Sequence, residues 1–191
     1  MKKTFILLLL IACVTSVYGQ KFAVKSNMLY DATSTINLGM EVGLAPKWSL
    51  DVSGNYNGWK FGNDKYLPNG TIDYATRLKH WGVQPELRYW FCEAFNGTFL
   101  GLHGHYADFN VSDIPFPGNS KFHRYQGDLY GAGLSLGHQW IMSKRWSLEA
   151  VIGAGWAYLD YDNCKNCGSK PENDNYFGVT KAAVSIIYFL K

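Results

Sequence analysis

Apolar and polar residues alternate along most of the chain from about Val24 onward. Between Trp48 and Tyr56 every second residue is apolar or glycine, and the residues between them are Ser49, Asp51, Ser53 and Asn55. Successive side chains of a strand point to opposite faces, so a segment with this period has one apolar face and one polar face. Residues 35–44 and 80–89 repeat the pattern. The alternation predicts a series of long amphipathic strands.

Eight such strands are expected, and the connections between them differ in length. Those after the second, fourth and sixth strands are short, whereas residues 60–77, 111–125 and 162–175 form long connections at the opposite end. Short turns at one end and long loops at the other are typical of bacterial outer-membrane barrels. The expected strands are residues 22–30, 35–44, 47–59, 78–91, 97–110, 126–141, 145–161 and 176–190.

Aromatic residues gather near both ends of these strands. Trp and Tyr favour the two membrane interfaces, so two aromatic girdles are a signature of a barrel that spans a bilayer. The sequence therefore predicts an all-β fold, an eight-stranded antiparallel up-and-down transmembrane β-barrel. Near the short turns lie Trp48, Phe91, Trp140 and Trp146, and toward the other rim lie Tyr56, Trp59, Tyr106, Trp156, Tyr158 and Tyr176.

The polar face carries charged residues interleaved with many of the 20 glycines. Eight strands enclose a lumen only wide enough for side chains, and charges held in such a space have to pair. Glycine leaves room for the long charged side chains beside it. We therefore expect a plugged lumen and not a pore, with a charge network of Lys25, Glu41, Asp51, Glu86, Arg88, Glu149 and Lys181.

The first residues have the pattern of a secretory signal peptide. Lys2 and Lys3 precede an apolar run, and small residues stand before a cut that follows Gly19. We therefore expect a signal peptide over residues 1–19 and a barrel domain over residues 20–191, located in the outer membrane. A rival reading makes Cys13 an acylated lipoprotein anchor. No apolar run reaches the length of a transmembrane helix, which excludes a helical membrane protein.

Charge and composition limit the kinds of molecule that the protein is expected to bind. Basic and acidic residues are nearly balanced once Lys2 and Lys3 are set aside, and no basic stripe is present, so nucleic acid is not an expected partner. The expected contacts are outer-membrane lipid and a surface partner met through the long loops. A soluble lipocalin-like barrel that binds a ligand is the alternative fold, and it would place the apolar face inside.

Two groups of residues suggest chemistry without establishing it. Cys164 and Cys167 lie in the last long loop, where a lone C-x-x-C in an oxidising compartment favours a disulfide over a metal site. His103 and His105 share a strand face and could bind a metal, although histidines on a polar face more often hydrogen-bond to their neighbours. We predict no metal site and no cofactor.

An enzyme that modifies outer-membrane lipid is the alternative function. Such an enzyme needs a nucleophile, a base and an orienting acid close together at the outer rim. His123 with Asp113 or Asp128, and Ser112 or Ser120, supply the residue types, but their spacing defines no triad. We expect the protein not to be an enzyme, and predict no catalytic residues.

Four segments carry a family resemblance. They are KSNMLYDATSTINLGMEVGLAPKWSLDVSGNYN, HWGVQPELRYWFCEAFNG, YGAGLSLGHQWIMSKRWSLEA and the ending IIYFLK. With them the chain resembles an uncharacterised family of small outer-membrane proteins from Bacteroidetes, a domain of unknown function of the DUF3575 type. The resemblance implies an outer-membrane barrel with a structural or surface-interaction role, linked to fimbrial or other surface assembly. It brings no catalytic or binding residue with it.

Overall fold

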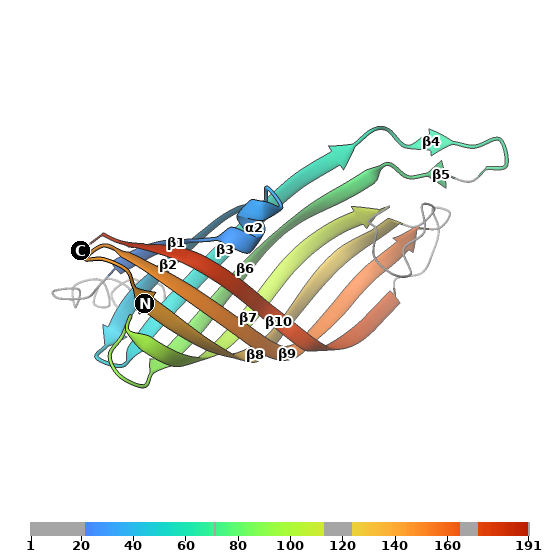
Figure 1. Ribbon diagram of the computed structural model, residues 1–191. Helices are drawn as coiled ribbons and strands as arrows, with labels where there is room; N and C mark the ends of the chain where they lie inside the picture. The colour runs from blue at the N-terminus through green and yellow to red at the C-terminus, as the bar shows by residue number, and fades with distance from the viewer. Residues whose placement is uncertain (1–21, 71, 113–123, 165–171, 191) are drawn as a thin grey trace, which may run out of the picture.

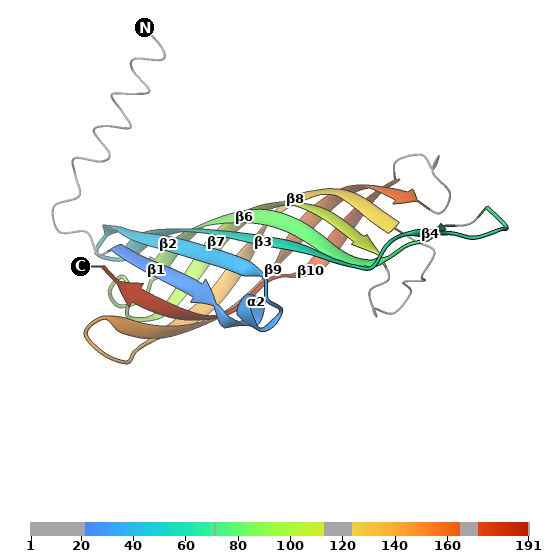
Figure 2. The same cartoon turned by 90° about the horizontal axis from the view of Figure 1, so that it is seen from above.

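Eight long strands close into a barrel in the computed structural model, which describes residues 22–70, 72–112, 124–164 and 172–190 (Figures 1 and 2). Around the barrel the order is β1-β10-β9-β8-β7-β6-β3-β2, and every neighbouring pair is antiparallel. The predicted up-and-down topology is confirmed. The strands are β1 (Phe22–Asn27), β2 (Ile36–Ala45), β3 (Trp48–Phe61), β6 (Thr76–Trp90), β7 (Gly97–Ser112), β8 (Arg124–Ile141), β9 (Trp146–Cys164) and β10 (Glu172–Phe189).

The two faces of the wall follow the alternation in the sequence. On β3, Ser49 and Asp51 are buried, whereas Trp48 and Val52 point outward. Outward apolar side chains are highly exposed, with Ile36 at 73% and Leu134 at 67%. The charged groups therefore lie inside and most large apolar groups outside, which is the reverse of the arrangement expected for the soluble lipocalin-like alternative. Among the described residues no helix has the length and apolar character needed to cross a membrane.

The first strand is shorter than predicted. It ends at Asn27 instead of continuing to Tyr30, and the helix α2 (Met28–Ala32) follows it. The reason is local, because the Asn27 side chain accepts a hydrogen bond from the Leu29 N–H at 3.1 Å and so caps the helix. The same side-chain oxygen accepts from the Val184 N–H of β10 at 3.2 Å. Asn27 thus ends the strand and ties the helix to the wall.

The strands at the loop end are longer than predicted. β8 already begins at Arg124, β9 continues to Cys164 and β10 begins at Glu172. β-branched and aromatic residues such as Val111 and Tyr125 favour extended backbone there, so the ladders continue into the expected loops. Within the expected loop 60–77, β4 (Lys65–Tyr66) and β5 (Ile72–Asp73) form a hairpin that projects beyond the barrel (Figure 1).

An apolar cluster fills the lumen at the end with the short turns. Trp90 stacks on Phe99 with ring centroids 4.6 Å apart, and Phe95 meets Phe189 at 5.4 Å. Trp90, Phe99 and Ile187 are fully buried, and the cluster also includes Ala23 of β1, Ala183 of β10 and Ala94 of the turn between β6 and β7. Because these side chains occupy the width of a narrow barrel, they close the lumen at the turn end.

Candidate functional site: the charged lumen and its cavity

Arg88 lies at the centre of an ionic network directly above the apolar cluster. Its Nε donates to Glu86 Oε2 at 2.6 Å, and its Nη1 donates to Glu41 at 2.8 Å and to Glu149 at 2.6 Å. Its Nη2 donates to Asp51 at 3.2 Å. The guanidinium also rests on the Phe99 ring, 4.3 Å from the centroid. One fully buried side chain therefore joins four carboxylates to the apolar cluster.

Two lysines complete the network from the other side of the lumen. Lys25 Nζ lies 2.6 Å from Glu41, 3.2 Å from Asp51 and 3.4 Å from Glu149. Lys181 Nζ lies 3.0 Å from Glu86 and 3.8 Å from Asp51. The structure therefore brings together all seven residues that the sequence nominated for the charge network: Lys25, Glu41, Asp51, Glu86, Arg88, Glu149 and Lys181.

Four carboxylates face three basic groups, so the network has a formal charge of −1. All of its members are less than a tenth exposed. Burial of a charge costs several kcal/mol unless ion pairs and hydrogen bonds compensate for it. Neutral groups add to the compensation: Ser135 donates to Glu86, Ser49 donates to Glu41 at 2.5 Å, and Trp90 Nε1 donates to Ser49 at 2.8 Å.

Glycines make room for this network, as the sequence led us to expect. Gly39 pairs with Lys25 across β1 and β2, and a Cβ at Gly39 would come within 2.5 Å of the Lys25 Cγ. A Cβ at Gly101 would strike Ser135 and Glu86. Side chains at either position would displace the charged groups from their partners.

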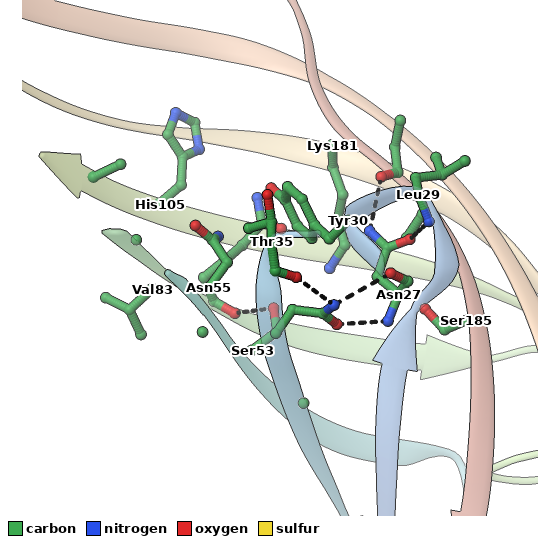
Figure 3. Close-up of a pocket in the computed structure, with 18 of the residues that line it drawn as sticks. Asn27, Leu29, Tyr30, Thr35, Ser53, Asn55, Val83, His105, Lys181 and Ser185 are labelled. Atoms are coloured by element: carbon green, nitrogen blue, oxygen red, sulfur yellow. Dashed lines mark hydrogen bonds between the residues drawn. The ribbon is translucent and has the colours of Figure 1, made fainter. Parts of the chain in front are cut away.

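A cavity of about 520 Å³ lies on the loop side of the network (Figure 3). Lys25, Asp51, Arg88, Glu149 and Lys181 contribute to its lining and form its floor. The wall is made mainly of uncharged side chains from α2 and several strands, among them Tyr30 of α2 and His105 of β7 (Figure 3). The lumen is thus plugged in its turn-side half and hollow in its loop-side half.

Several polar groups of the cavity lack an internal partner. His105 Nδ1 is buried without a hydrogen bond, and within the described part of the chain the side chains of Asn55, His80 and Ser185 make none either. Buried polar groups are normally satisfied, so unsatisfied groups that line one cavity indicate a space for a polar ligand or water. The cavity can accept hydrogen-bonding groups.

The other residues singled out from the sequence have separate surroundings. His103 is buried and its Nε2 lies 2.9 Å from Thr180 Oγ1, and its ring centroid is 5.8 Å from that of His105. In the described ranges no three His, Cys, Asp or Glu side chains are grouped as a metal site. The predicted disulfide cannot be placed, because Cys167 lies outside the described residues and only the backbone of Cys164, at the end of β9, lies within them.

The residues of the enzyme hypothesis do not form a group in the described ranges. Ser112 donates to the Ala75 carbonyl at 2.6 Å, and Asp128 accepts from the Tyr106 hydroxyl at 2.8 Å. Asp113, Ser120 and His123 lie outside those ranges, as do the predicted signal peptide and Cys13.

Sequence reasoning missed three parts of the site. It did not find the hydrogen bonds of Ser49 and Ser135, the stacking of Arg88 on Phe99, or the cavity and its α2 wall. A signal existed for the serines and for Phe99, because they fall on the same alternating face as the charges. The helix could have been suspected from Asn27, a preferred N-cap residue, before the run Met28–Ala32.

An ion pair outside the charge network, between Arg77 and Asp64, holds the base of the projecting hairpin together. Arg77 Nη2 donates to Asp64 Oδ1 at 2.5 Å and Oδ2 at 2.8 Å, and the Ala75 N–H donates to Asp64 Oδ1 at 2.9 Å. Partial burial of Asp64 raises its pKa, but the Ala75 hydrogen bond and the Arg77 guanidinium outweigh burial. Together they hold the pKa of Asp64 below its usual 3.8.

Removal of Arg88 should destabilise the barrel strongly. Arg88→Met leaves four buried carboxylates with two lysines, so we expect a loss of about 3–5 kcal/mol in the free energy of unfolding. The double variant Arg88→Met/Glu149→Gln restores the original charge balance and should lose less than the sum of the two single variants. Urea unfolding of all four proteins measures the coupling. Strictly additive losses would show that the network does not act as a unit.

Acid should loosen the hairpin base. Because the folded pKa of Asp64 is lowered, its ionised form contributes stability that is present above the ordinary pKa of 3.8 and is lost as pH falls through the lower folded value. We expect pepsin to cleave residues 62–76 faster as pH falls from about 5 to about 2. Asp64→Asn should remove this dependence, and identical pH profiles for the two proteins would contradict the assignment.

Comparisons with known proteins define the family but no activity. No curated protein matches the chain. Among solved structures, it is similar to a major outer membrane protein from Thermus thermophilus, with 11% sequence identity and a TM-score of 0.40 over 91% of this chain and all of that one. The model of a family described as "Protein of unknown function (DUF3575)" matches residues 5–190. The chain therefore belongs to the DUF3575 family.

Proposed function

We propose that the protein is a non-enzymatic outer-membrane barrel that does not conduct and that contacts a surface partner through its loops. The observation that carries the proposal is the distribution of polarity across a closed wall. Seven charged side chains pair inside, while outward positions such as Leu134 and Ile152 are apolar and exposed. A wall of this kind is stable where hydrocarbon surrounds it, because antiparallel ladders between neighbouring strands pair the backbone within the wall.

The outward aromatic residues also support the proposed location in a membrane. Near the turn end Trp48 packs on Tyr89 and Trp146 on Tyr188, with centroids 5.1 Å and 4.9 Å apart. Toward the loop end Trp81 packs on Tyr106 at 5.4 Å. Such pairs at both ends of the apolar band match the two interfacial layers of a bilayer. The strands beyond the outer girdle would then stand in the external solvent.

The lumen supports a role other than transport. The apolar cluster around Trp90 and the network around Arg88 fill the barrel in succession, so no continuous aqueous path crosses the described part of the lumen. Ser112 and Asp128 are engaged with other partners, which supports a role without catalysis.

The loop end supplies the proposed contact surface. The β4–β5 hairpin stands clear of the barrel (Figure 1). Tyr66 of β4 is 82% exposed, and Phe61 at the end of β3 is 60% exposed. Exposed aromatic side chains are common anchors in protein interfaces. We propose that the hairpin contacts a surface protein, with a fimbrial subunit as the specific hypothesis.

Fractionation and conductance test the placement. We expect the protein in the outer-membrane fraction, extracted only by detergent, with heat-modifiable migration on a gel. In planar bilayers it should show no stable open channel, since the lumen is closed at the turn end. Recovery in the soluble periplasmic fraction would refute the membrane location. A wide, persistent conductance would refute the plugged lumen.

Removal of the hairpin aromatics tests the contact. In Tyr66→Ser/Phe61→Ser cells we expect fewer surface fibres per cell by electron microscopy, because two exposed anchors are lost. The variant barrel should keep its outer-membrane location and its heat-modifiable migration, since neither side chain is buried. An unchanged fibre count in cells with normal amounts of the variant would contradict the fimbrial hypothesis.

A further inference from the structure

We propose that the cavity binds the head of an uncharged membrane amphiphile, which enters from the outer leaflet through an opening in the barrel wall between β3 and β10. The ligand class is a lipid or glycolipid with hydroxyl or amide groups in its head and a hydrocarbon chain that remains in the membrane. This inference rests on the proposed outer-membrane location and adds a binding site to it.

The opening exists because β1 is short. β1 pairs with β10 only from Ala23↔Phe189 to Asn27↔Ser185, whereas β10 pairs with β9 up to Glu172. On the other side, β2 pairs with β3 only up to Ile36↔Tyr56, and residues 57–61 of β3 pair with β6 alone. Above α2, therefore, no strand among the described residues pairs with β3 or β10 on the sides that face one another (Figure 2).

Helix α2 marks the lower limit of the opening. The Asn27 side chain satisfies the edge of β10 there, because it accepts from the Val184 N–H at 3.2 Å and donates to the Ala182 carbonyl at 3.4 Å. Higher on β10, the carbonyls of Thr180 and Val179 accept side-chain hydrogen bonds from Gln84 and Tyr176, each at 3.4 Å. An open strand edge is costly in hydrocarbon, so a polar group that fills the opening would stabilise the wall.

The cavity reaches this opening. Its lining includes Leu29 and Tyr30 of α2, at the lower limit of the gap, and residues 179–183 of β10, on one side of it. Val179 and Ala182 are among them although both are exposed on the outside of the wall. The outer rim is apolar, with Ile36, Phe177 and Val179 at 73%, 76% and 56% exposure. The passage therefore changes from an apolar rim to a polar interior, as an amphiphile with its head inside requires.

The polar side chains that line the cavity determine which kind of lipid head group can bind there. Asn55, His80, His105 and Ser185 offer both donors and acceptors that are not used within the described chain. The charged groups of the floor are already paired: Lys25 and Arg88 each contact Asp51 and Glu149, and Lys181 contacts Asp51. A charged head would have to compete with these buried ion pairs, whereas hydroxyl or amide groups can bond to the free side chains without breaking them.

Photo-cross-linking tests the site in the full-length mature barrel. The probe is dodecyl maltoside with a diazirine on the chain carbon next to the head, added to the protein in phospholipid nanodiscs. After irradiation and digestion, mass spectrometry should find adducts on residues 27–37 and 179–185. Adducts confined to outward residues such as Leu100 and Leu134 would overturn the proposal.

Two substitutions and one matched control distinguish labelling inside the cavity from labelling of the membrane-facing surface in general. Asn55→Trp fills the cavity and should abolish the cavity adducts. Val179→Trp narrows the outer opening and should reduce them. Ala154→Trp changes the outward residue that pairs with Val179 on β9, away from the gap, and should leave them unchanged. Equal cavity labelling in all three proteins, each with normal heat-modifiable migration, would refute lateral entry.

A probe with the same chain and a phosphate head tests the selectivity, and we expect it to label the cavity much less than the maltoside does. Equal labelling by the two probes would overturn the assignment of an uncharged head.

The proposed function and the proposed binding site fail in different ways. A chain absent from the outer membrane refutes the proposed function, whereas a membrane-embedded barrel without cavity adducts refutes only this site.

Discussion

The cost of burying charge inside a narrow barrel is the constraint on which the rest of this structure depends. Arg88 can be buried there only because four carboxylates surround it, and those carboxylates can be buried only because Lys25 and Lys181 complete the set. Each strand that supplies a member is therefore fixed in register relative to the others. Glycines at positions 39 and 101 follow from the same constraint, because the long side chains need the space that a Cβ would take.

The network also divides the lumen into parts with different properties. Below it, Phe99 and Trp90 exclude water and link the apolar cluster to the charges through cation–π stacking and the Ser49 hydrogen bond. Above it, uncharged polar side chains leave a cavity. A barrel closed at one end and hollow at the other has the form of a cup, so its geometry favours holding a ligand over passing it through.

The sequence predicted the wall better than the contents of the lumen. Strand number and the inward face could be predicted because side chains alternate with period two and charges avoid an apolar exterior, as Asp51 and Val52 show. The partners of Arg88 could not be assigned, since pairing depends on strand register and on rotamers of long side chains. The cavity was not predicted, because it depends on where β1 stops. That stop follows from one capping side chain, Asn27, within a segment that otherwise alternates like a strand.

The aromatic cluster around Trp90 has a consequence for how the barrel responds to temperature. In the proposed membrane location, outward residues such as Leu134 gain little from contact with one another, whereas Trp90, Phe95, Phe99 and Ile187 are buried as in the core of a soluble protein. Withdrawal of apolar surface from water weakens on cooling and carries a large heat-capacity change. The turn end of the barrel should therefore lose stability on cooling, while the hydrogen-bonded ladders at the loop end keep theirs.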